Sequence, residues 1–215
     1  MVKKRALFMK ILYIACAVFG VWLPHMSNSF SAIPLETEQL FLRPVQLSDT
    51  KDIAEIALNP LVTKLCGVFP PVKTIEDVER FVRVYLLGAP ALGILPRYPV
   101  SWVMVEKISG RIVGLVIFCA YLERHQRAEL AFVAAPDYWN KGYTMQACQA
   151  VIRYAFSRGL LRIYATVDPE NKVSEHVLQK LQMSFEGVLR SYMIVNGKRV
   201  DRKMYAIIAS DVQHE

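Results

Sequence analysis

The sequence predicts an α/β fold, a mixed sheet with helices on both of its faces. Apolar runs of strand length alternate along the chain with longer stretches in which apolar residues recur every three or four positions. Residues 129–156 contain both patterns in succession, as a strand, a short turn and a helix. Hairpin signals at 108–110 and 196–197 indicate that several neighbouring strands pair antiparallel.

Residues 1–33 differ from the rest of the chain, and a single domain is predicted at 34–215. A basic start precedes thirteen apolar residues at 11–23 and a short polar stretch, which is the outline of a secretory signal. Thirteen residues fall short of the roughly twenty that span a bilayer. Three interpretations stay open: a signal or membrane anchor, a packed or disordered extension, and a misassigned start with Met26 as the true initiator.

Charge and ligand composition argue against two classes of function. The net charge is +7, but four of these charges lie in the first ten residues, and the remainder is not basic enough to indicate nucleic-acid binding. The four histidines and four cysteines show no metal-ligand spacing and no CxxC pair. No metal is therefore expected, and the cysteines are interpreted as reduced core thiols.

The first half of the predicted domain opens with a strand at 40–46. Ser48 is expected to cap the helix that follows. The buried face of that helix comprises Ile53, Ile56 and Ala57. Thr74 and Asp77 have the spacing of a capping box and start a second helix. Its predicted buried stripe consists of Val78, Phe81, Val82, Tyr85 and Leu86. The prolines and glycines of 88–99 indicate a loop.

The second half supplies most of the sheet. Strands are predicted at 101–107, 111–121, 128–134 and 161–168. Asp168-Pro169 ends the last of these, because proline cannot donate to a strand ladder. The helix that follows is expected to turn inward Val177, Leu178 and Leu181. Asn196-Gly197 then predicts a type I′ hairpin.

The junction at 129–156 also predicts a phosphate-binding site. Pro136 ends the strand, and the turn at 137–142 leads into a helix with apolar residues at 147, 150, 151, 154 and 155. A helix start exposes unpaired N–H groups and carries about +0.5 charge. Lys141 adds a full positive charge beside it, as phosphate binding favours. Most such junctions bind nothing, and neither a Walker A pattern nor a GxGxxG fingerprint is present.

Three longer segments carry a resemblance to a known family: YWNKGYTMQA at 138–147, NKVSEHVLQKLQMSFEGVLR at 171–190, and YMIVNGKRVDRKMYAI at 192–207. They resemble the GNAT superfamily of acetyl-CoA-dependent N-acetyltransferases, and within it the ribosomal-protein-alanine N-acetyltransferase branch. The resemblance covers 37–210. It implies a GNAT-like, mostly antiparallel, twisted central sheet, and acetyl-CoA as the acyl donor.

The resemblance also implies which residues contact the cofactor. Main-chain N–H groups that hold the pyrophosphate are expected at Asn140, Lys141, Gly142, Tyr143 and Thr144. Phe132 and Val133 are expected where the strand splays and its main chain pairs with the pantetheine arm. Asn171 is expected to contact the same arm. Phe132 and Val133 can be core residues at the same time.

Two residues are candidates for proton transfer. The resemblance implies Glu129 as the candidate base, since GNAT enzymes often place a carboxylate on this strand. Burial at the end of an apolar run would raise the pKa of that carboxylate toward a useful value. The alternative is a surface glutamate beside Arg127. Ser174 matches a serine of the ribosomal-protein branch and is expected to protonate the leaving thiolate. The alternatives are local: Asn171 as a turn residue and Ser174 as a first-turn helix hydroxyl.

Several positions depart from the family pattern. Thr144 stands where relatives have alanine or glycine, Leu178 where many have tyrosine, and Gln182-Met183 where the helix usually ends in Gly-Phe. A non-glycine residue in a left-handed cap costs about 1 kcal/mol, so a local difference is expected at that turn. Met193 replaces a carboxylate base of some relatives.

A site with a weak or remote base favours an acceptor amine of low pKa, because a larger fraction of that amine is already neutral at pH 7. An α-amine with a pKa of about 7.7–8.0 is roughly one-tenth neutral at pH 7, whereas lysine, with a pKa of about 10.4, is neutral in under a thousandth of molecules. The predicted reaction is therefore acetyl transfer from acetyl-CoA to a primary amine, most of all the α-amine of a peptide or protein N-terminus, by direct attack in a ternary complex.

Two other functions stay open: a non-catalytic acyl-CoA-binding or regulatory module on the same fold, and a membrane-tethered interaction domain. A cytoplasmic location is expected because acetyl-CoA is a cytosolic metabolite. The alternative is membrane association or export through the N-terminal segment, with membrane contact through 1–25. The sequence makes no prediction of the oligomeric state.

Overall fold

The computed structural model describes residues 30–65, 69–87, 100–195 and 197–212. By its internal contacts the chain divides into Met1–Phe30 and Ser31–Glu215, and the second unit carries the fold. The predictions for the leader and for the loop at 88–99 lie outside the described residues. Within the described ranges, no helix has the length and apolarity needed to cross a bilayer.

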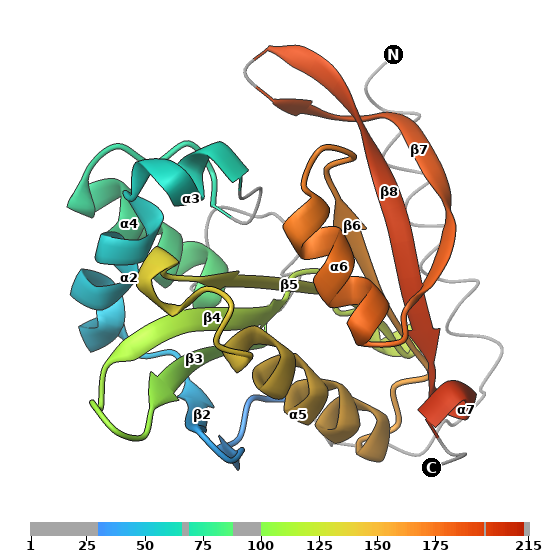
Figure 1. Ribbon diagram of the computed structural model, residues 1–215, viewed down its shortest axis with the longest axis horizontal. Coiled ribbons are helices and arrows are strands. Elements are labelled where there is room, and N and C mark those ends of the chain that lie inside the picture. The colour runs from blue at the N-terminus through green and yellow to red at the C-terminus, as the bar shows by residue number, and fades with distance from the viewer. Residues whose placement is uncertain (1–29, 66–68, 88–99, 196, 213–215) are drawn as a thin grey trace, which may run out of the picture. The chain divides into compact units, whose positions relative to one another are not determined.

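Eight strands form one sheet in the order β1-β2-β3-β4-β5-β6-β8-β7 (Figure 1). Their bounds are β1 Leu35–Glu36, β2 Leu40–Pro44, β3 Val100–Glu106, β4 Ile112–Phe118, β5 Arg127–Ala134, β6 Arg162–Val167, β7 Ser184–Val195 and β8 Lys198–Ile208. Neighbouring strands pair antiparallel, except β5 and β6, which are parallel. The predicted mixed, mostly antiparallel sheet is confirmed.

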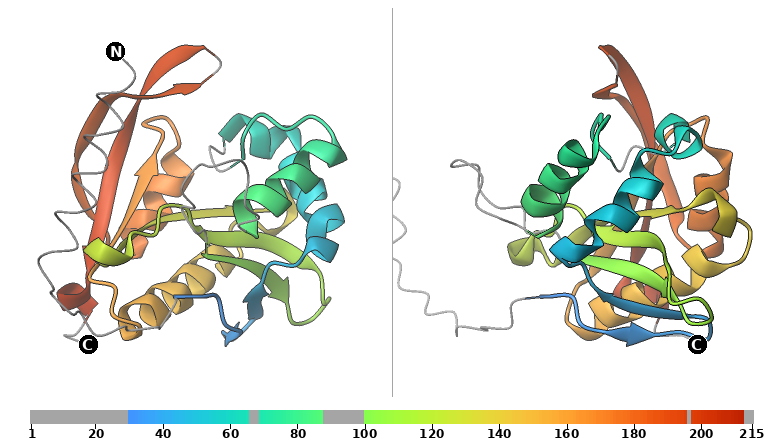
Figure 2. Two further views of the ribbon diagram at one scale, coloured as in Figure 1. Left: turned by 180° about the vertical axis from the view of Figure 1, so that it is seen from behind. Right: turned by 90° about the vertical axis from the view of Figure 1, so that its left-hand side faces the viewer.

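Helices cover both faces of this sheet, as predicted. The longer ones are α2 Thr50–Ala57, α3 Pro60–Leu65, α4 Ile75–Phe81, α5 Tyr143–Ser157 and α6 Lys172–Lys180. Shorter turns are η1 Leu47–Asp49, η2 Val82–Leu86, η3 Glu123–His125, η4 Pro136–Tyr138 and α7 Ala209–Val212. The edge-on view of Figure 2 shows α2 and α4 on one side of the strands and α5 and α6 on the other.

The alternation of side chains along the strands explains the two-sided core. Val103 and Leu115 face α2 and α4 and belong to one buried apolar cluster with them. Their neighbour Trp102 faces the other way, where its ring meets that of Tyr154 on α5, with centroids 6.1 Å apart. Because both faces are buried, β3 and β4 read as continuous apolar runs rather than as alternating ones.

The two predicted helix starts have different outcomes. Thr74 caps α4 as expected: its hydroxyl accepts from the N–H of Asp77 at 3.2 Å, and the Asp77 carboxylate accepts from the N–H of Thr74 at 3.2 Å. The prediction that Ser48 caps the first helix is wrong. A short 3₁₀ turn precedes α2, and its capping contact is made by the Asp49 carboxylate, which accepts from the N–H of Gln46 at 2.8 Å.

Tyr85 also departs from its predicted place. Its side chain is 58% exposed, whereas Val82 and Leu86 are buried. The segment η2 is a π-helix, and the wider turn breaks the 3.6-residue period on which the predicted stripe depends. Tyr85 instead stacks on the ring of Phe81, with centroids 5.6 Å apart.

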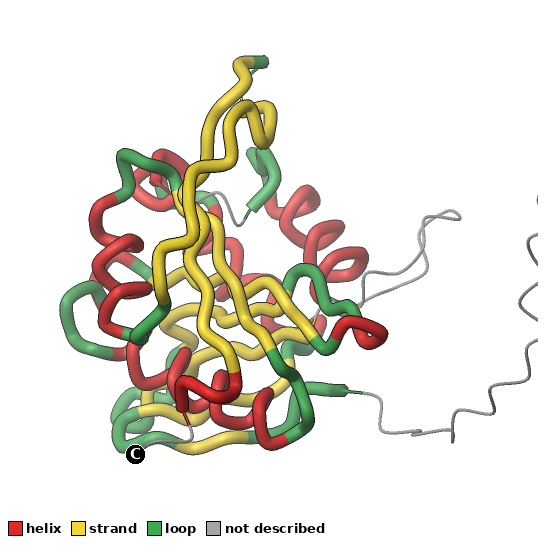
Figure 3. Tube along the Cα trace, turned by 90° about the vertical axis from the view of Figure 1, so that its right-hand side faces the viewer, coloured by secondary structure: helices red, strands yellow, loops and turns green. Residues whose placement is uncertain are grey.

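The β7–β8 hairpin projects beyond the rest of the sheet (Figure 3). It confirms the hairpin prediction, although Asn196 lies outside the described residues and the turn type stays a prediction. The turn between α6 and β7 keeps a left-handed residue without glycine, because Gln182 itself adopts a φ of 61°. The expected local difference from relatives at this turn stays a prediction.

Candidate functional site

The sheet opens at its centre, where its one parallel pair is short. β5 and β6 pair only through Arg127–Glu129 and Arg162–Tyr164. The rest of β5, Leu130–Ala134, pairs with β4 alone. The two strands therefore separate at mid-length, and the free edge of β5 faces the side on which β6 has left it.

The main-chain groups at this edge follow from strand alternation. The carbonyl of Glu129 accepts from the N–H of Cys119, and the N–H of Ala135 donates to the carbonyl of Val113, so odd-numbered residues of β5 bond toward β4. The N–H and C=O of Phe132 consequently point away from β4, into the opening. No strand in the described part of the chain pairs with them there. Such an edge can pair with an extended ligand.

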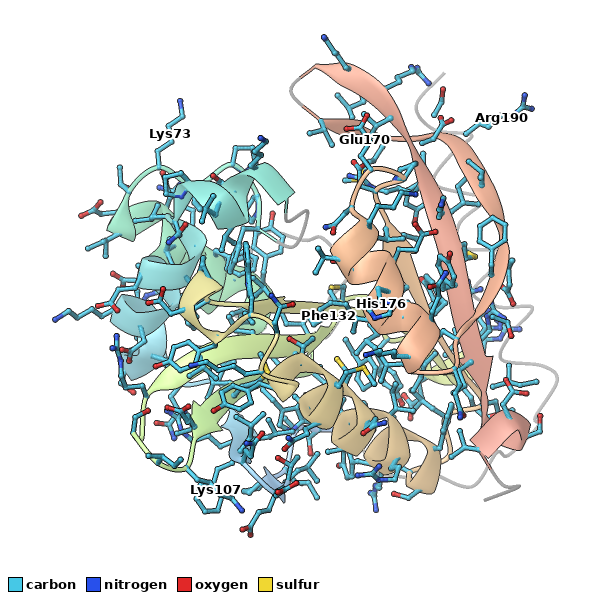
Figure 4. The ribbon with its side chains drawn as sticks, viewed as in Figure 1. Lys73, Lys107, Phe132, Glu170, His176 and Arg190 are labelled. Atoms are coloured by element: carbon cyan, nitrogen blue, oxygen red, sulfur yellow. The ribbon has the colours of Figure 1, made fainter. Side chains whose placement is uncertain are left out.

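A pocket of about 110 Å³ lies at this opening, lined by residues of α3, β5, α5 and α6. Its walls are mainly apolar, and its polar side chains come from Thr144, Asn171 and Ser174. Phe132 and Val133 lie on its β5 side; Figure 4 labels Phe132 on that strand, on the side toward α6. The structure thus brings five of the predicted site residues together. Their roles stay predictions.

The loop that enters α5 contains two residues with a left-handed backbone conformation. Asn140 has a φ of 61° and Gly142, the N-cap residue, a φ of 79°. The first helical hydrogen bond runs from the N–H of Gln146 to the carbonyl of Gly142 at 3.1 Å, which leaves the preceding N–H groups without helical partners. A Cβ on Gly142 would meet no protein atom within 4 Å, so its positive φ is what favours glycine.

Tyr143 anchors this helix start rather than lining the pocket with its side chain. It is 6% exposed, and its hydroxyl donates to Glu106 on β3 at 2.5 Å. Hydrogen bonds from Ser109 and Tyr143 lower the pKa of Glu106, and the same bond to Glu106 raises the pKa of Tyr143. Its predicted role concerns its main-chain N–H, which lies in the first turn of α5.

The side chain of Lys141 is exposed beside this turn, with Nζ 4.6 Å from the ring centroid of Tyr138. It makes no ion pair with a carboxylate in the described ranges. A second polar contact fixes the helix from the other side: Thr37 donates to the Gln146 side chain at 2.9 Å. Two side-chain contacts thus hold the first turn of α5, and Lys141 lies exposed beside it.

Asn171 and Ser174 begin α6 on the opposite side of the pocket. Asn171 is the N-cap residue, and its Oδ1 accepts from the N–H of Ser174 at 3.0 Å. The local capping role considered for Asn171 is thus present, and it leaves a contact with a ligand possible because the residue also lines the pocket.

Glu129 does not line this pocket. It lies half-buried at the last residue of the parallel pairing, where its Oε1 accepts a hydrogen bond from Thr166 Oγ1 at 2.9 Å. The structure therefore brings Ser174 to the pocket and Glu129 to the point where β5 and β6 separate. Two residues that differ from the family pattern have structural contacts of their own. Leu178 is 1% exposed in the core, and Sδ of Met193 lies 3.2 Å from Nε of Arg202.

One polar cluster was missed by the sequence prediction. Glu175 on α6 accepts from Lys203 at 2.5 Å, from Tyr205 at 2.7 Å and from Lys172 at 3.0 Å. These hydrogen bonds, that from Lys203 first, lower the pKa of Glu175 to about 2. The spacing in the sequence could have indicated that Glu175 faces inward. It precedes the inward Leu178 by three residues and so shares its helix face.

In the described residues, no three histidine, cysteine or carboxylate side chains gather as a metal-ligand set. The site is instead a strand edge, a helix N-terminus and an apolar pocket between them. The polar groups that converge on it are hydroxyls, an amide and main-chain N–H groups.

Comparison with known proteins assigns this arrangement to a family. A family model described as an acetyltransferase (GNAT) domain matches residues 39–184. An uncharacterised N-acetyltransferase of Bacillus subtilis (strain 168), YoaA, is 30% identical over 175 residues, which cover 81% of this chain and 96% of that protein. A solved GNAT-family acetyltransferase from Bacillus anthracis is 27% identical with a TM-score of 0.70, covering 83% of this chain and 99% of that chain.

A further solved structure extends the likeness of fold. RimL, a ribosomal L7/L12 alpha-N-protein acetyltransferase in complex with coenzyme A, superposes with a TM-score of 0.71 at 20% identity, over 82% of this chain and 98% of that chain. Its likeness concerns the fold alone, whereas the family match spans most of the described unit. The chain belongs to the GNAT family of acetyltransferases.

Proposed function

We propose that this protein transfers the acetyl group of acetyl-CoA to a primary amine, with the α-amine of a peptide or protein N-terminus as the preferred acceptor. The observation that carries the proposal is the opening between β5 and β6, where a free strand edge and the N-terminus of α5 border one pocket. The family supplies the reaction class, and the residues around the opening supply the roles.

The donor would be held in two places. The diphosphate would bind the N–H groups of Asn140, Lys141, Gly142, Tyr143 and Thr144, with the Lys141 ammonium beside it. The pantetheine arm would pair with the edge of β5 at Phe132 and Val133, and Asn171 would contact it from α6. Thr144 lines the pocket with a branched side chain, which narrows the seat without removing the main-chain donor.

The chemistry then needs one base and one acid. The amine lone pair attacks the thioester carbonyl, the C–S bond breaks, and an amide and the free thiol of coenzyme A result. Glu129 would accept the proton that the attacking amine loses, and Ser174 would donate a proton to the departing thiolate, itself reprotonated from solvent. Ser174 supports this role by lying on the pocket wall.

The preference for an α-amine rests on acid–base properties. Met193 stands where some relatives carry a second carboxylate, so the site has little means of deprotonating an amine of high pKa. An α-amine is neutral in about one-tenth of molecules at pH 7, a lysine side chain in under a thousandth. The neutral form that attacks the thioester is therefore more than about a hundred times more abundant for the α-amine than for lysine.

A matched pair of peptides tests the proposal. One has a free N-terminus and no lysine, and the other has the same sequence with a blocked N-terminus and one lysine. Thiol release from acetyl-CoA should be faster with the first peptide by at least about tenfold. Faster release with the second would contradict the α-amine preference. Release with neither peptide and none with a wider amine panel, despite coenzyme A binding, would favour the silent acyl-CoA-binding module.

Ser174→Ala tests the acid. Turnover with the better peptide should fall by about tenfold or more, because the thiolate would leave unprotonated. The affinity for acetyl-CoA, measured by calorimetry, should change little. Unchanged turnover would remove Ser174 from the mechanism and leave the capping of α6 by Asn171 as the role of this turn.

A further inference from the structure

We propose that Thr166 is a positioning residue for acetyl transfer: its hydroxyl holds the Glu129 carboxylate at the point where β5 and β6 separate. The inference rests on the proposed function, in which Glu129 accepts the proton of the attacking amine. It adds a residue that lies 37 positions away along the chain and belongs to a different strand.

The register of the two strands places the pair. Glu129 lies opposite Tyr164, and this is the last pair of the parallel ladder. Thr166 follows two residues later on the same face of β6, where β5 no longer pairs with it. The hydrogen bond of 2.9 Å from Thr166 Oγ1 to Glu129 Oε1 therefore joins the strands beyond the end of their main-chain ladder.

The donor is itself held in place. β6 stays paired with β8 at this level, with Thr166 opposite Met204, so the backbone that carries the hydroxyl is fixed on its other side. A β-branched side chain also has few χ1 choices. A glutamate, in contrast, has three rotatable bonds. The hydroxyl thus selects one orientation of a flexible carboxylate, and it does so without a change of backbone.

The bond has a chemical consequence as well as a geometric one. A hydroxyl that donates to a carboxylate favours the ionised form, which is the form that accepts a proton. Correct orientation of a reacting group lowers the entropic part of the barrier. Loss of the hydroxyl should therefore change both the rate and its dependence on pH.

Other ionisable groups surround Glu129 and stay the same when Thr166 is changed. Arg127 precedes it on β5 and lies over the ring of Tyr164 on β6, with the guanidinium carbon 6.0 Å from the centroid. Cys119 adjoins it from the β4 side. At the start of β6, Arg162 pairs with Glu186, and just after the end of β6, Asp168 pairs with Arg202. A difference between variants at Thr166 reports on the hydroxyl and not on these charges.

The test compares Thr166→Val, which removes the hydroxyl and keeps the branched shape, with Thr166→Ser, which keeps the hydroxyl. For Thr166→Val we expect kcat to fall by about tenfold and the acidic limb of the kcat/KM profile to move up by about one pH unit. Thr166→Ser should keep the wild-type profile. Coenzyme A affinity should agree within about twofold in all three proteins. Thr166→Ala serves as a second variant without hydroxyl if Thr166→Val does not fold.

The decisive part of the test introduces Thr166→Val into a protein that already carries Glu129→Gln. If the hydroxyl acts through the carboxylate, Thr166→Val should add no further loss of kcat in that background. An equal loss in both backgrounds, or a lower kcat with an unmoved acidic limb, would reduce Thr166 to a structural role. Wild-type turnover in Glu129→Gln itself would overturn both the base and this inference, while the peptide assay would still report whether acetyl transfer occurs.

Discussion

The two halves of the sheet are held together by different forces. β1–β5 lie between two helical layers and are joined to them by apolar packing. β6–β8 carry α6, and the link between this helix and β8 is a set of charged and hydroxyl groups around Glu175. The first half thus has a large apolar cluster on one face, whereas the second half adds a charged cluster around Glu175 to the apolar packing of Leu178. The proposed site lies where they meet.

The burial of the strands also differs between the two halves. β4 is buried along nearly its whole length, whereas β7 is largely exposed, with Ile194 and Phe185 turned to solvent. In the described residues, the short parallel ladder of β5 and β6 and the adjoining bonds to the carbonyl of Gln126 join the halves through the main chain. The proposed site lies at this junction, with α5 on one side of the pocket and the start of α6 on the other. Changes in the two halves should therefore have effects of different size and different pH dependence.

The largest expected effect is a loss of packing in the first half. Leu115 on β4 is 0% exposed within the cluster formed by α2, α4 and three strands. Leu115→Ala should lower the free energy of unfolding by about 3 kcal/mol, because it removes buried methyl groups and leaves a cavity. Denaturant titration measures this loss. Leu61→Ala is the matched control, since that leucine is 54% exposed and should cost under about 0.5 kcal/mol.

The comparison would fail if Leu115→Ala cost no more than Leu61→Ala. Packing between β4 and the layer of α2 and α4 would then contribute little to the stability of the first half.

A smaller effect, with a distinct pH signature, is expected in the second half. Partners of Glu175 lower its folded pKa to about 2 from an ordinary value of 4.5. Its stabilising contribution is therefore complete above pH 4.5 and is lost as the pH falls toward 2. Glu175→Gln should lower Tm at pH 7 by on the order of 5 °C. The difference from wild type should shrink between pH 4.5 and 2.

Glu170→Gln provides the control for that experiment. It makes the same change of charge at an exposed position just before α6, and it should leave Tm nearly unchanged at every pH. A Tm deficit of Glu175→Gln that stayed constant down to pH 2 would mean that the cluster acts by shape and not by charge.

The smallest expected effect compares two helix starts within the first half. Thr74→Ala removes the capping hydroxyl of α4 and should cost about 1 kcal/mol. Ser48→Ala should cost less than about 0.5 kcal/mol, because Asp49 and not Ser48 makes the capping contact before α2. Equal costs in urea unfolding would contradict the assignment of these caps.

Much of the scaffold could be predicted because its signals are local. The capping box of α4, the turn at 108–110 and the glycine before α5 each depend on residues within four positions of one another. The π-turn that exposes Tyr85 left no such signal, since a single inserted residue changes the period without changing the composition.

The second half and its junction with the first were harder to predict, because the residues that bond there are far apart in the sequence. Thr166 meets Glu129 across 37 residues, and Lys203 meets Glu175 across 28. The parallel register of β5 with β6 and the pairing of β6 with β8 bring these residues together. The sequence could name Glu129 as a candidate base. It could not supply the partner that orients it.

The central claim is that the main chain at the start of α5 binds the diphosphate of coenzyme A. Calorimetric titration of the full chain with coenzyme A and with pantetheine, which lacks the diphosphate, tests it most directly. We expect one site per chain for coenzyme A, an affinity that weakens as salt rises, and binding of pantetheine weaker by at least about tenfold. No heat with coenzyme A on folded protein, or equal affinity for the two compounds, would contradict the claim.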